Sequence, residues 1–310
     1  MKIAILSFED IGKSATREEL RLAAAARELG YSAKIFRVDK CQLVYDPNHP
    51  CVLYDGKIFP QYDVLIPRPT VLRNVDLQIA IIKQFQLTGM PVVNTFHAIS
   101  RAKNKLRTMQ ILDHYGIPIP KTIVVRDLKY VNNEILKQVH GPPVILKTPF
   151  GSYGSGVVIA ESKRAVVSAL NFLWKENKIN IILLQEYMKE SRGKDVRVFV
   201  IGGKVIAAMV RSAAKGEFRS NIELGGEGEK TRLSQREEKV AIAATKALKL
   251  EVAGVDIIRS RKGPMVLEVN ANPGFKTLEE VTGINIAKYI IEYAVRKAKR
   301  LKQEKEEAAL

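Results

Sequence analysis

The stretch Asp256-Ile-Ile-Arg-Ser-Arg-Lys-Gly-Pro-Met-Val-Leu-Glu268-Val-Asn270-Ala-Asn272-Pro-Gly decides the fold of this chain. Its pattern predicts two short strands joined by a Gly-Pro turn, with Asp256 opening the first strand. Glu268 and Asn270 lie two residues apart on the second strand, so their side chains point to the same face. A carboxylate among Val, Ile, Leu and Met needs a partner. Two carboxylates and an amide carbonyl form an all-oxygen ligand set that suits Mg²⁺ or Mn²⁺ carried on nucleotide phosphates. The alternative is an ordinary hairpin whose polar residues face solvent.

Strands and helices alternate along the first part of the chain. Buried-strand patterns occupy residues 2-7, 33-38, 62-68 and 91-94, and helical patterns occupy residues 16-29 and 75-88. This alternation predicts parallel pairing in an N-terminal Rossmann-like α/β domain over residues 1-95. The first strand is followed by Ser7-Phe-Glu-Asp-Ile-Gly12, which does not match G-x-G-x-x-G, so dinucleotide binding is not expected there.

The rest of the chain predicts two further units and a tail, giving a mixed α/β (α+β) protein. The expected central domain covers residues 96-184, and a domain with the metal site covers residues 185-300. A charged tail covers residues 301-310. The remaining elements are a helix carrying Ala102, Leu106, Met109 and Leu112, strands at 121-125, 143-147, 157-160 and 181-188, a helix at 163-177, a hairpin at 195-211 about Gly202-Gly203, and a long loop at 213-230.

Composition places the chain among globular proteins. Of its 310 residues, 46% are hydrophobic, which is more than a disordered chain carries. No apolar run approaches the roughly 20 residues of a membrane span, and the first strand is interrupted too soon for a signal peptide. Cys41 and Cys51 stand in a loop-like region without a metal-ligand pattern. We therefore expect free thiols in a cytoplasmic protein without membrane contact.

The formal net charge of +17 favours anionic partners such as nucleotide phosphates, acidic peptides or RNA. The positive residues are spread along the chain, and no recognised nucleic-acid module is present. Nucleic acid is therefore not expected to be the direct substrate.

A glycine-rich turn follows a buried strand that ends at Lys147. The glycines of Gly151-Ser-Tyr-Gly154-Ser-Gly156 allow the backbone to approach a phosphate, and Lys147 adds a point charge. The order of lysine and glycines excludes a Walker A loop. A merely flexible turn is the other interpretation, and Lys105, on the helix before it, is by itself consistent with a solvated lysine.

Two other segments carry polar groups that could bind parts of a nucleotide. The apolar strand ends in Gln185-Glu186-Tyr187, where backbone groups can contact an adenine edge and a carboxylate can bind ribose, and Asp195 follows shortly after. Arg211 and the segment Phe218-Arg219-Ser220-Asn221 supply cations and donors that can neutralise a phosphoryl group in transfer. A plain buried strand and a solvated loop are the alternatives.

Together these segments resemble the ATP-grasp superfamily, and more closely the RimK-type α-L-glutamate ligases that add glutamate to a ribosomal protein. The segments that carry the resemblance follow one another in order over nearly the whole chain: Arg101-Ala-Lys-Asn-Lys105-Leu-Arg-Thr-Met, Lys147, Gln185-Glu186-Tyr187, Asp195-Val-Arg197, Phe218-Arg219-Ser220-Asn221, Val252-Ala-Gly-Val-Asp256-Ile, Glu268-Val-Asn270-Ala-Asn272-Pro-Gly274 and Thr282-Gly-Ile-Asn-Ile-Ala.

The resemblance implies an ATP-grasp fold and many of the site residues. The metal ligands would be Asp256, Glu268 and Asn270. The nucleotide contacts that it implies are Lys105, Lys147, Glu186, Tyr187, Asp195, Arg219, Ser220 and Asn221. Taken together with the residue patterns above, it leads us to expect Gln185 among the nucleotide contacts, and Arg219, Lys147 and Arg211 to act on the transferring phosphate.

The resemblance also implies the reaction. A substrate carboxylate would attack the γ-phosphate of ATP to give an acyl phosphate and ADP, and an amine would then displace phosphate to form an amide. Two Mg²⁺ or Mn²⁺ ions per site would balance the phosphate charge. The expected amine donor is L-glutamate, the acceptor is a ribosomal protein or another glutamate-ending peptide, and the protein is expected to be a homo-oligomer, either a dimer or a tetramer.

One departure leaves the acceptor open. Phe150 precedes the first loop glycine, where many ribosomal-protein ligases of this type have a glutamate. The run Lys-Thr-Pro-Phe-Gly-Ser looks more like relatives that act on a coenzyme or on an amino-group carrier protein of lysine biosynthesis. Two other functions stay open as well, namely a kinase that stops at the phosphorylated product and a nucleotide- or RNA-binding protein without catalysis.

Overall fold

A parallel sheet of three strands, in the order β2-β1-β6, forms the centre of the N-terminal part. The computed structural model describes residues 1–70, 74–151, 154, 156–177, 181–191 and 193–308. The sheet strands are β1 (Lys2–Ser7), β2 (Ser32–Arg37) and β6 (Val64–Arg68), and the helices of this part are α1 (Arg17–Glu28) and α2 (Val75–Leu87). The expected parallel α/β arrangement is confirmed.

Two expectations for this part were wrong. The predicted strand at 91-94 is reduced to a single bridge between Leu65 and Val92, because Asn94 turns its side chain toward residues 251–271. The loop-like region around the cysteines is an antiparallel sheet of β3 (Cys41–Val44), β4 (Cys51–Tyr54) and β5 (Lys57–Ile58). Both cysteines are free, as expected, and burial raises the pKa of Cys41 to about 12.

The middle of the chain forms an antiparallel sheet of four strands in the order β7-β10-β8-β9. A single helix was predicted to lead into this sheet, but the structure has two. The Asn104 side chain accepts hydrogen bonds from Leu106 N and Arg107 N, so a new helix begins at this point. The elements are α3 (Phe96–Ala102), α4 (Lys105–His114), β7 (Thr122–Val125), α5 (Asn133–Gln138), β8 (Val144–Lys147), β9 (Val157–Ala160), α6 (Lys163–Asn177) and β10 (Ile182–Glu186).

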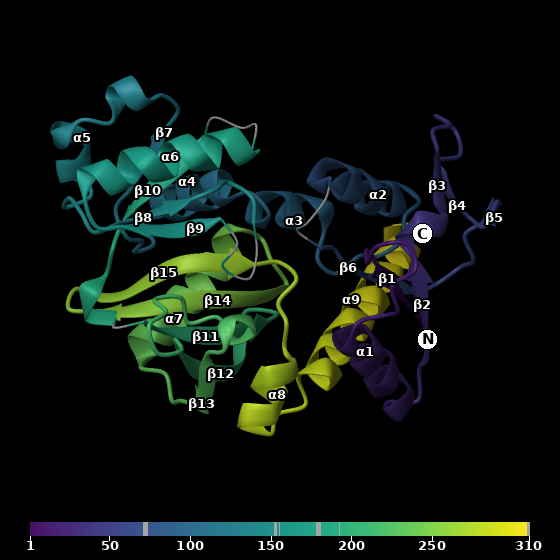
Figure 1. The fold of residues 1–310 in the computed structure, drawn as a ribbon. Coiled ribbons are helices and arrows are strands. Elements are labelled where there is room, and N and C mark those ends of the chain that lie inside the picture. The colour runs from purple at the N-terminus through teal and green to yellow at the C-terminus, as the bar shows by residue number, and fades with distance from the viewer. Residues whose placement is uncertain (71–73, 152–153, 155, 178–180, 192, 309–310) are drawn as a thin grey trace.

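A second antiparallel sheet has five strands in the order β13-β12-β11-β14-β15. Figure 1 shows it stacked on the four-stranded sheet, with the N-terminal part to one side. The elements of this part are β11 (Lys194–Ile201), β12 (Lys204–Ser212), β13 (Glu227–Lys230), α7 (Gln235–Ala247), β14 (Val252–Ser260), β15 (Gly263–Asn270), α8 (Lys276–Thr282) and α9 (Ile286–Ala308).

The β14–β15 hairpin differs in detail from its prediction. Asp256 lies in the middle of β14, and the turn is at Arg261-Lys262, so that Gly263 and Pro264 already belong to β15. The hairpin about Gly202-Gly203 is confirmed. The segment 213–230 was predicted to be a loop throughout, but its last residues form β13, which pairs with β12.

The last helix returns to the N-terminal part. Residues of α9 such as Ile290 and Ile291 pack in one buried cluster with Ile3 and Ile5 of β1 and Leu22 of α1. Figure 1 accordingly shows α9 beside α1 and β1. The charged end expected at 301-310 continues this helix to Ala308. Among the described residues, no helix is long and apolar enough to cross a membrane.

Asn94 joins the N-terminal part to the hairpin that carries the carboxylates. It is 3% exposed. Its Nδ2 donates to Val252 O at 2.7 Å and to Ala271 O at 2.9 Å, and its Oδ1 accepts from Glu251 N at 2.7 Å and from Val252 N at 2.9 Å. One side chain thereby fixes the start of β14 and the end of β15 together.

We expect Asn94→Ala to lower the free energy of unfolding by roughly 2–4 kcal/mol, because it leaves several buried backbone groups unpaired. Thermal unfolding followed by circular dichroism measures the loss. The control is Asn48→Ala at an exposed loop position, which should change the midpoint little. Equal midpoints for the two variants would contradict this role of Asn94.

Candidate active site

A cavity of about 130 Å³ lies between the two stacked sheets, lined by residues of β8 and β10 on one side and of β11, β12, β14 and β15 on the other. Every predicted site residue except Asn270 lines it. The residues that the structure brings together there are Lys105, Lys147, Gln185, Glu186, Tyr187, Asp195, Arg211, Arg219, Ser220, Asn221, Asp256 and Glu268.

Lys147 is held at the end of β8 by its neighbour on the paired strand. Its Nζ donates to Gln185 Oε1 at 2.6 Å, and Gln185 Nε2 in turn donates to Thr122 Oγ1 at 2.9 Å. Burial lowers the pKa of Lys147 to about 8, although the carboxylate of Glu268 acts in the other direction. Within the described part of the chain no carboxylate contacts this buried amine, an arrangement that suits the binding of an anion.

The cavity also has an apolar part of its lining. It consists of hydrophobic side chains that the sequence reasoning did not select: Ile145, Val157, Met188, Ile258 and Leu267. Strand alternation was the available signal for Ile145, which is two residues before Lys147 on β8. Glu186 lines the same cavity, accepts weakly from Lys121 N at 3.4 Å and lies 3.6 Å from His140 Nε2. A cavity with these side chains can receive a flat, apolar ring beside a carboxylate.

Charged side chains form a row across the five-stranded sheet. The strand register sets Asp195 opposite Arg211, Arg197 opposite Asp256, and Asp256 opposite Glu268. Arg211 donates to both oxygens of Asp195, at 2.8 and 2.6 Å. Its Nη2 also lies 3.0 Å from Asp256 Oδ2, and Arg197 Nε lies 3.1 Å from Asp256 Oδ1.

Burial and the neighbouring charges act in opposite directions on the pKa values of Asp256 and Arg211. Burial raises the pKa of Asp256, and Arg197 and Arg211 act against that rise. Burial alone would lower the pKa of Arg211, but the carboxylates of Asp256 and Asp195 outweigh it and raise the pKa. Arg211 is thus a permanent cation.

The predicted metal ligands offer oxygen atoms, which are the ligands that a hard cation such as Mg²⁺ prefers. Asp256 and Glu268 face each other across β14 and β15, and Asn270 pairs with Gly254 one step along the same face. Asp256 Oδ1 is buried and accepts no hydrogen bond from the described residues. Those residues hold no cluster of three or more His, Cys, Asp and Glu side chains, so a metal here would rely on two carboxylates and an amide.

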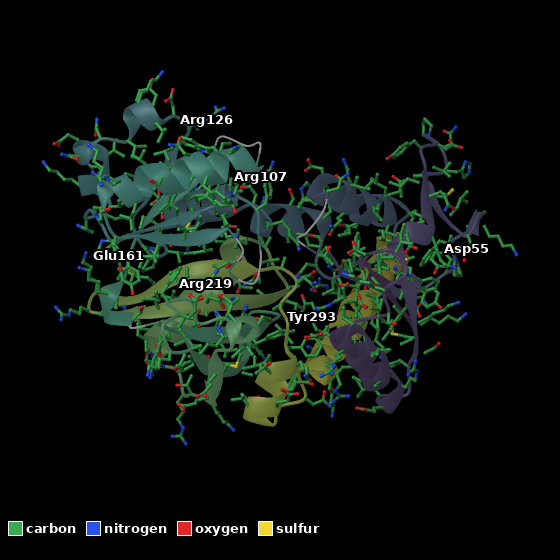
Figure 2. The ribbon with its side chains drawn as sticks, in the orientation of Figure 1. Asp55, Arg107, Arg126, Glu161, Arg219 and Tyr293 are labelled. Carbon is green, nitrogen blue, oxygen red and sulfur yellow. The ribbon has the colours of Figure 1, made fainter. Side chains whose placement is uncertain are left out.

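Arg219 lies at the wall of the cavity, bound to its own loop and to the glycine-rich turn. Its guanidinium pairs with Glu217 at 2.7 Å and donates to Gly154 O at 3.0 Å. Figure 2 shows the residue in the region between the two sheets. The hydrogen bond from Arg219 lowers the pKa of Glu217 to about 2. The predicted turn residues Ser152, Tyr153 and Ser155 lie outside the described residues.

A second, larger cavity of about 360 Å³ adjoins the first and shares Asp256 and Glu268 with it. Asn270 lines this second cavity. So do five residues that sequence reasoning did not select as site residues: Glu18, Arg68, Lys103, Arg197 and Asn272. Arg197 was accessible to that reasoning, because it lies two residues from Asp195 on β11, whereas the others come from segments far apart in the chain.

Solved structures of low sequence identity share the fold. The ATP-grasp ligase PsnB with a minimal precursor superimposes with a TM-score of 0.73 at 19% identity, covering 95% of this chain and 98% of that chain. D-alanine–D-alanine ligase from Bacillus anthracis, complexed with ATP, gives 0.72 at 18% identity and covers 98% and 99%. These likenesses define an ATP-grasp fold.

Family models and sequence relatives give the narrower assignment. The model of the RimK PreATP-grasp domain matches residues 1–99, and that of the RimK-like ATP-grasp domain matches residues 102–294. A probable α-L-glutamate ligase of Pseudoalteromonas atlantica is 41% identical, covering 96% of this chain and 97% of its own. One of a Picosynechococcus strain is 39% identical, covering 96% of each. The chain belongs to the RimK-like ATP-grasp family and is an ATP-dependent carboxylate–amine ligase.

We expect Lys147→Ala to weaken ATP binding by about 2 kcal/mol or more, the scale of a charge-assisted hydrogen bond, because the ammonium lies in a desolvated cavity. Isothermal titration calorimetry with ATP measures the change. Lys163→Ala, at an exposed position at the start of α6, is the matched control. Unchanged affinity in Lys147→Ala would remove this residue from the nucleotide site.

The pKa of Lys147, about 8, also predicts a pH dependence. Bound polyphosphate favours the ammonium form, so ATP affinity should stay level below pH 8 and fall as the pH rises above it. Calorimetry at pH 8.5 in two buffers of different ionisation enthalpy should show proton uptake on binding. Lys147→Arg, which stays charged, should not show it. Equal uptake by the two proteins would assign the titration to another group.

Proposed function

We propose that this ligase adds L-glutamate to the C-terminus of a ribosomal protein or of another glutamate-ending acceptor. The observation that carries the proposal is the arrangement in the first cavity, where Lys105, Lys147 and Arg211 surround the carboxylate pair Asp256 and Glu268. The names of the relatives, probable α-L-glutamate ligases, support glutamate as the amino acid. A net charge of +17 suits an acidic acceptor.

The reaction we propose has two steps. A carboxylate oxygen of the acceptor attacks the γ-phosphorus of ATP, the bond to the β-phosphate oxygen breaks, and ADP leaves. The amine of glutamate then attacks the acyl carbon, phosphate leaves with the former carboxylate oxygen, and the amine loses a proton to solvent. Lys105, Lys147 and Arg211 would hold the phosphates and offset the charge that moves from the γ-phosphate to ADP.

Asp256, Glu268 and Asn270 would hold magnesium or manganese, and we propose two ions per site. When bound, the ions would offset the negative charge of the phosphates. A structure of the neighbour PsnB was determined with Mg and ADP. Arg197 and Arg211 contact Asp256, and Lys105 lies 4.0 Å from Glu268, so a metal ion would share these carboxylates with the cations of the protein.

The residue before the glycine-rich turn favours a different acceptor substrate. Phe150 is 37% exposed beside the glycine-rich turn, at the position where the resemblance to ribosomal-protein ligases leads us to expect a glutamate. A coenzyme or an amino-group carrier protein would then receive the amino acid. The domain division at 95/96 and 184/185, the homo-oligomeric state and the closure of the 213–230 loop stay predictions.

The function is tested by ADP release and by mass spectrometry. ADP release that needs both L-glutamate and an acceptor, with a mass gain of one or more glutamate residues, supports the proposal. Trapping with hydroxylamine should capture the acyl phosphate. Phosphorylated product without amide would identify a kinase, and ATP binding without any turnover would identify a non-catalytic nucleotide-binding protein.

We expect Glu268→Gln to keep the fold but to lower kcat about 10²-fold, because one of the charges that balance the metal is gone. The rate is measured by ADP release over a range of Mg²⁺ concentrations. Glu161→Gln, on the surface after β9, removes the same charge away from the site and should be normal. A near-normal rate for Glu268→Gln at saturating Mg²⁺ would refute its role as a ligand.

A further inference from the structure

The guanidinium of Arg219 lines the first cavity together with Asp256 and Glu268, and Figure 2 shows the residue between the two stacked sheets. A free arginine side chain samples many rotamers, and ordering it at a ligand costs free energy. Arg219 is instead held by protein groups, namely its own loop, the glycine-rich turn and an aromatic ring. The residue that holds it most firmly therefore prepares it for an anion.

Glu217 holds the guanidinium by a two-point contact. Its Oε1 accepts from Arg219 Nε at 3.0 Å, and its Oε2 accepts from Nη2 at 2.7 Å. Arg219 Nη1 donates to Gly154 O at 3.0 Å, and Arg219 Cζ lies 5.5 Å from the centre of the Phe218 ring. These hydrogen bonds use three of the five N–H groups of a guanidinium. The other two have no partner among the described residues, and a phosphate accepts two such bonds at once.

The carboxylate of Glu217 is itself fixed by the backbone around it. Its Oε1 accepts from Phe218 N at 2.8 Å and from Arg219 N at 3.0 Å. Glu217 N donates to Ala214 O at 3.0 Å, which closes a turn just before these residues. The hydrogen bond from Arg219 lowers the pKa of Glu217 to about 2, so the group stays ionised at neutral pH. Glu217 is thus a charged anchor with a fixed orientation.

The same two-point contact occurs at a second arginine of the cavity. Arg211 donates through Nε and Nη2 to the two carboxylate oxygens of Asp195, at 2.8 and 2.6 Å. Asp195 lines the cavity itself, whereas Glu217 is not among the residues that line it in the described part of the chain. An effect of Glu217 on a molecule bound in the cavity therefore passes through Arg219.

We propose that Glu217 is a positioning residue for the ligase reaction, and that it holds Arg219 in the orientation in which the two remaining N–H groups bind the phosphoryl group in transfer. The proposal rests on the proposed ligase function. Because the carboxylate neutralises the guanidinium, Glu217 adds no attraction for free ATP. It contributes a fixed geometry, which is most important for the charge that develops as the phosphoryl group moves.

Glu217→Gln separates geometry from charge. The glutamine oxygen can still accept from Phe218 N and Arg219 N, but the amide NH₂ cannot accept from Arg219 Nη2. We expect kcat to fall about tenfold and the KM for ATP to stay level or to fall, because the guanidinium is no longer neutralised. ADP release measures both constants, with L-glutamate and a synthetic peptide that ends in two glutamates. The control is Glu227→Gln at the exposed start of β13, which should keep both.

A double-mutant cycle tests whether the effect passes through Arg219. Arg219→Ala alone should lower kcat about 10²-fold. In that background, Glu217→Gln should change kcat less than about twofold, because the group that it positions is gone. Losses that multiply would show that Glu217 acts by another route and would overturn the inference. A raised KM for ATP at unchanged kcat in Glu217→Gln would overturn it as well.

A binding measurement separates the inference from the function on which it rests. Calorimetry with Mg²⁺, ADP and aluminium fluoride, a mimic of the phosphoryl group in transfer, needs neither amino acid nor acceptor. Glu217→Gln should bind this mimic about tenfold more weakly and ATP no more weakly than the wild type does. Equal weakening of both, or of neither, overturns the inference and leaves the function standing.

A wild-type protein without ADP release that depends on L-glutamate overturns the proposed function, and the inference is then decided by the binding of the mimic. Thermal unfolding shows whether the variants are folded. Should Glu217→Gln fail to fold, Glu217→Asp replaces it. Its carboxylate is one methylene shorter and loses the two-point contact, so the same split between kcat and the KM for ATP is expected.

Discussion

The row of charges across β12, β11, β14 and β15, buried at Arg211, Asp195 and Asp256, is the constraint on which the rest of the site depends. Three carboxylates and two guanidiniums face one another in it, namely Asp195, Asp256, Glu268, Arg197 and Arg211. Buried ion pairs often add little stability over apolar residues of the same size. Their presence at the centre of a sheet therefore indicates a function. The row carries one negative charge in excess, and Lys105 at 4.0 Å from Glu268 is the nearest compensating cation.

The position of this row is set by packing around the hairpin. At Gly254 any Cβ would lie 2.5 Å from Arg197 Nη1 and 2.8 Å from Pro273, so only glycine leaves room for the guanidinium to cross β14. Asn94 ties both ends of the hairpin to the N-terminal part. The helix α9 then packs against α1 and β1. These contacts hold the parallel sheet beside the hairpin, and the second cavity is lined by residues from both parts.

The features that depend on the alternation of side chains along one strand could be predicted from the sequence. Glu268 and Asn270 share a face because strands alternate, and Lys147 ends its strand as expected. The features that depend on contacts between segments far apart in the chain could not be predicted. The depth of Asp256 in β14 follows from pairing with β11, and Glu217, which binds Arg219, looks like any charged loop residue. Glu18, Arg68 and Asn272 meet only after three segments fold together, so no spacing in the chain marks them.

Both cavities are lined by residues of the β14–β15 hairpin, which therefore separates two sides of the site. Asp256 and Glu268 line both, whereas Lys147 and Glu186 line only the first and Glu18 and Asn272 only the second. In the proposed function, a phosphate bound near the shared carboxylates would lie between β8 and β10 on one side and the N-terminal part on the other. Both cavities are lined by cations and by carboxylates, and Lys105 and Arg211 line both of them. The sign of the charges therefore does not distinguish the two cavities. The elements that close them do, because β8 and β10 line only the first, whereas α1 and the end of β6 line only the second.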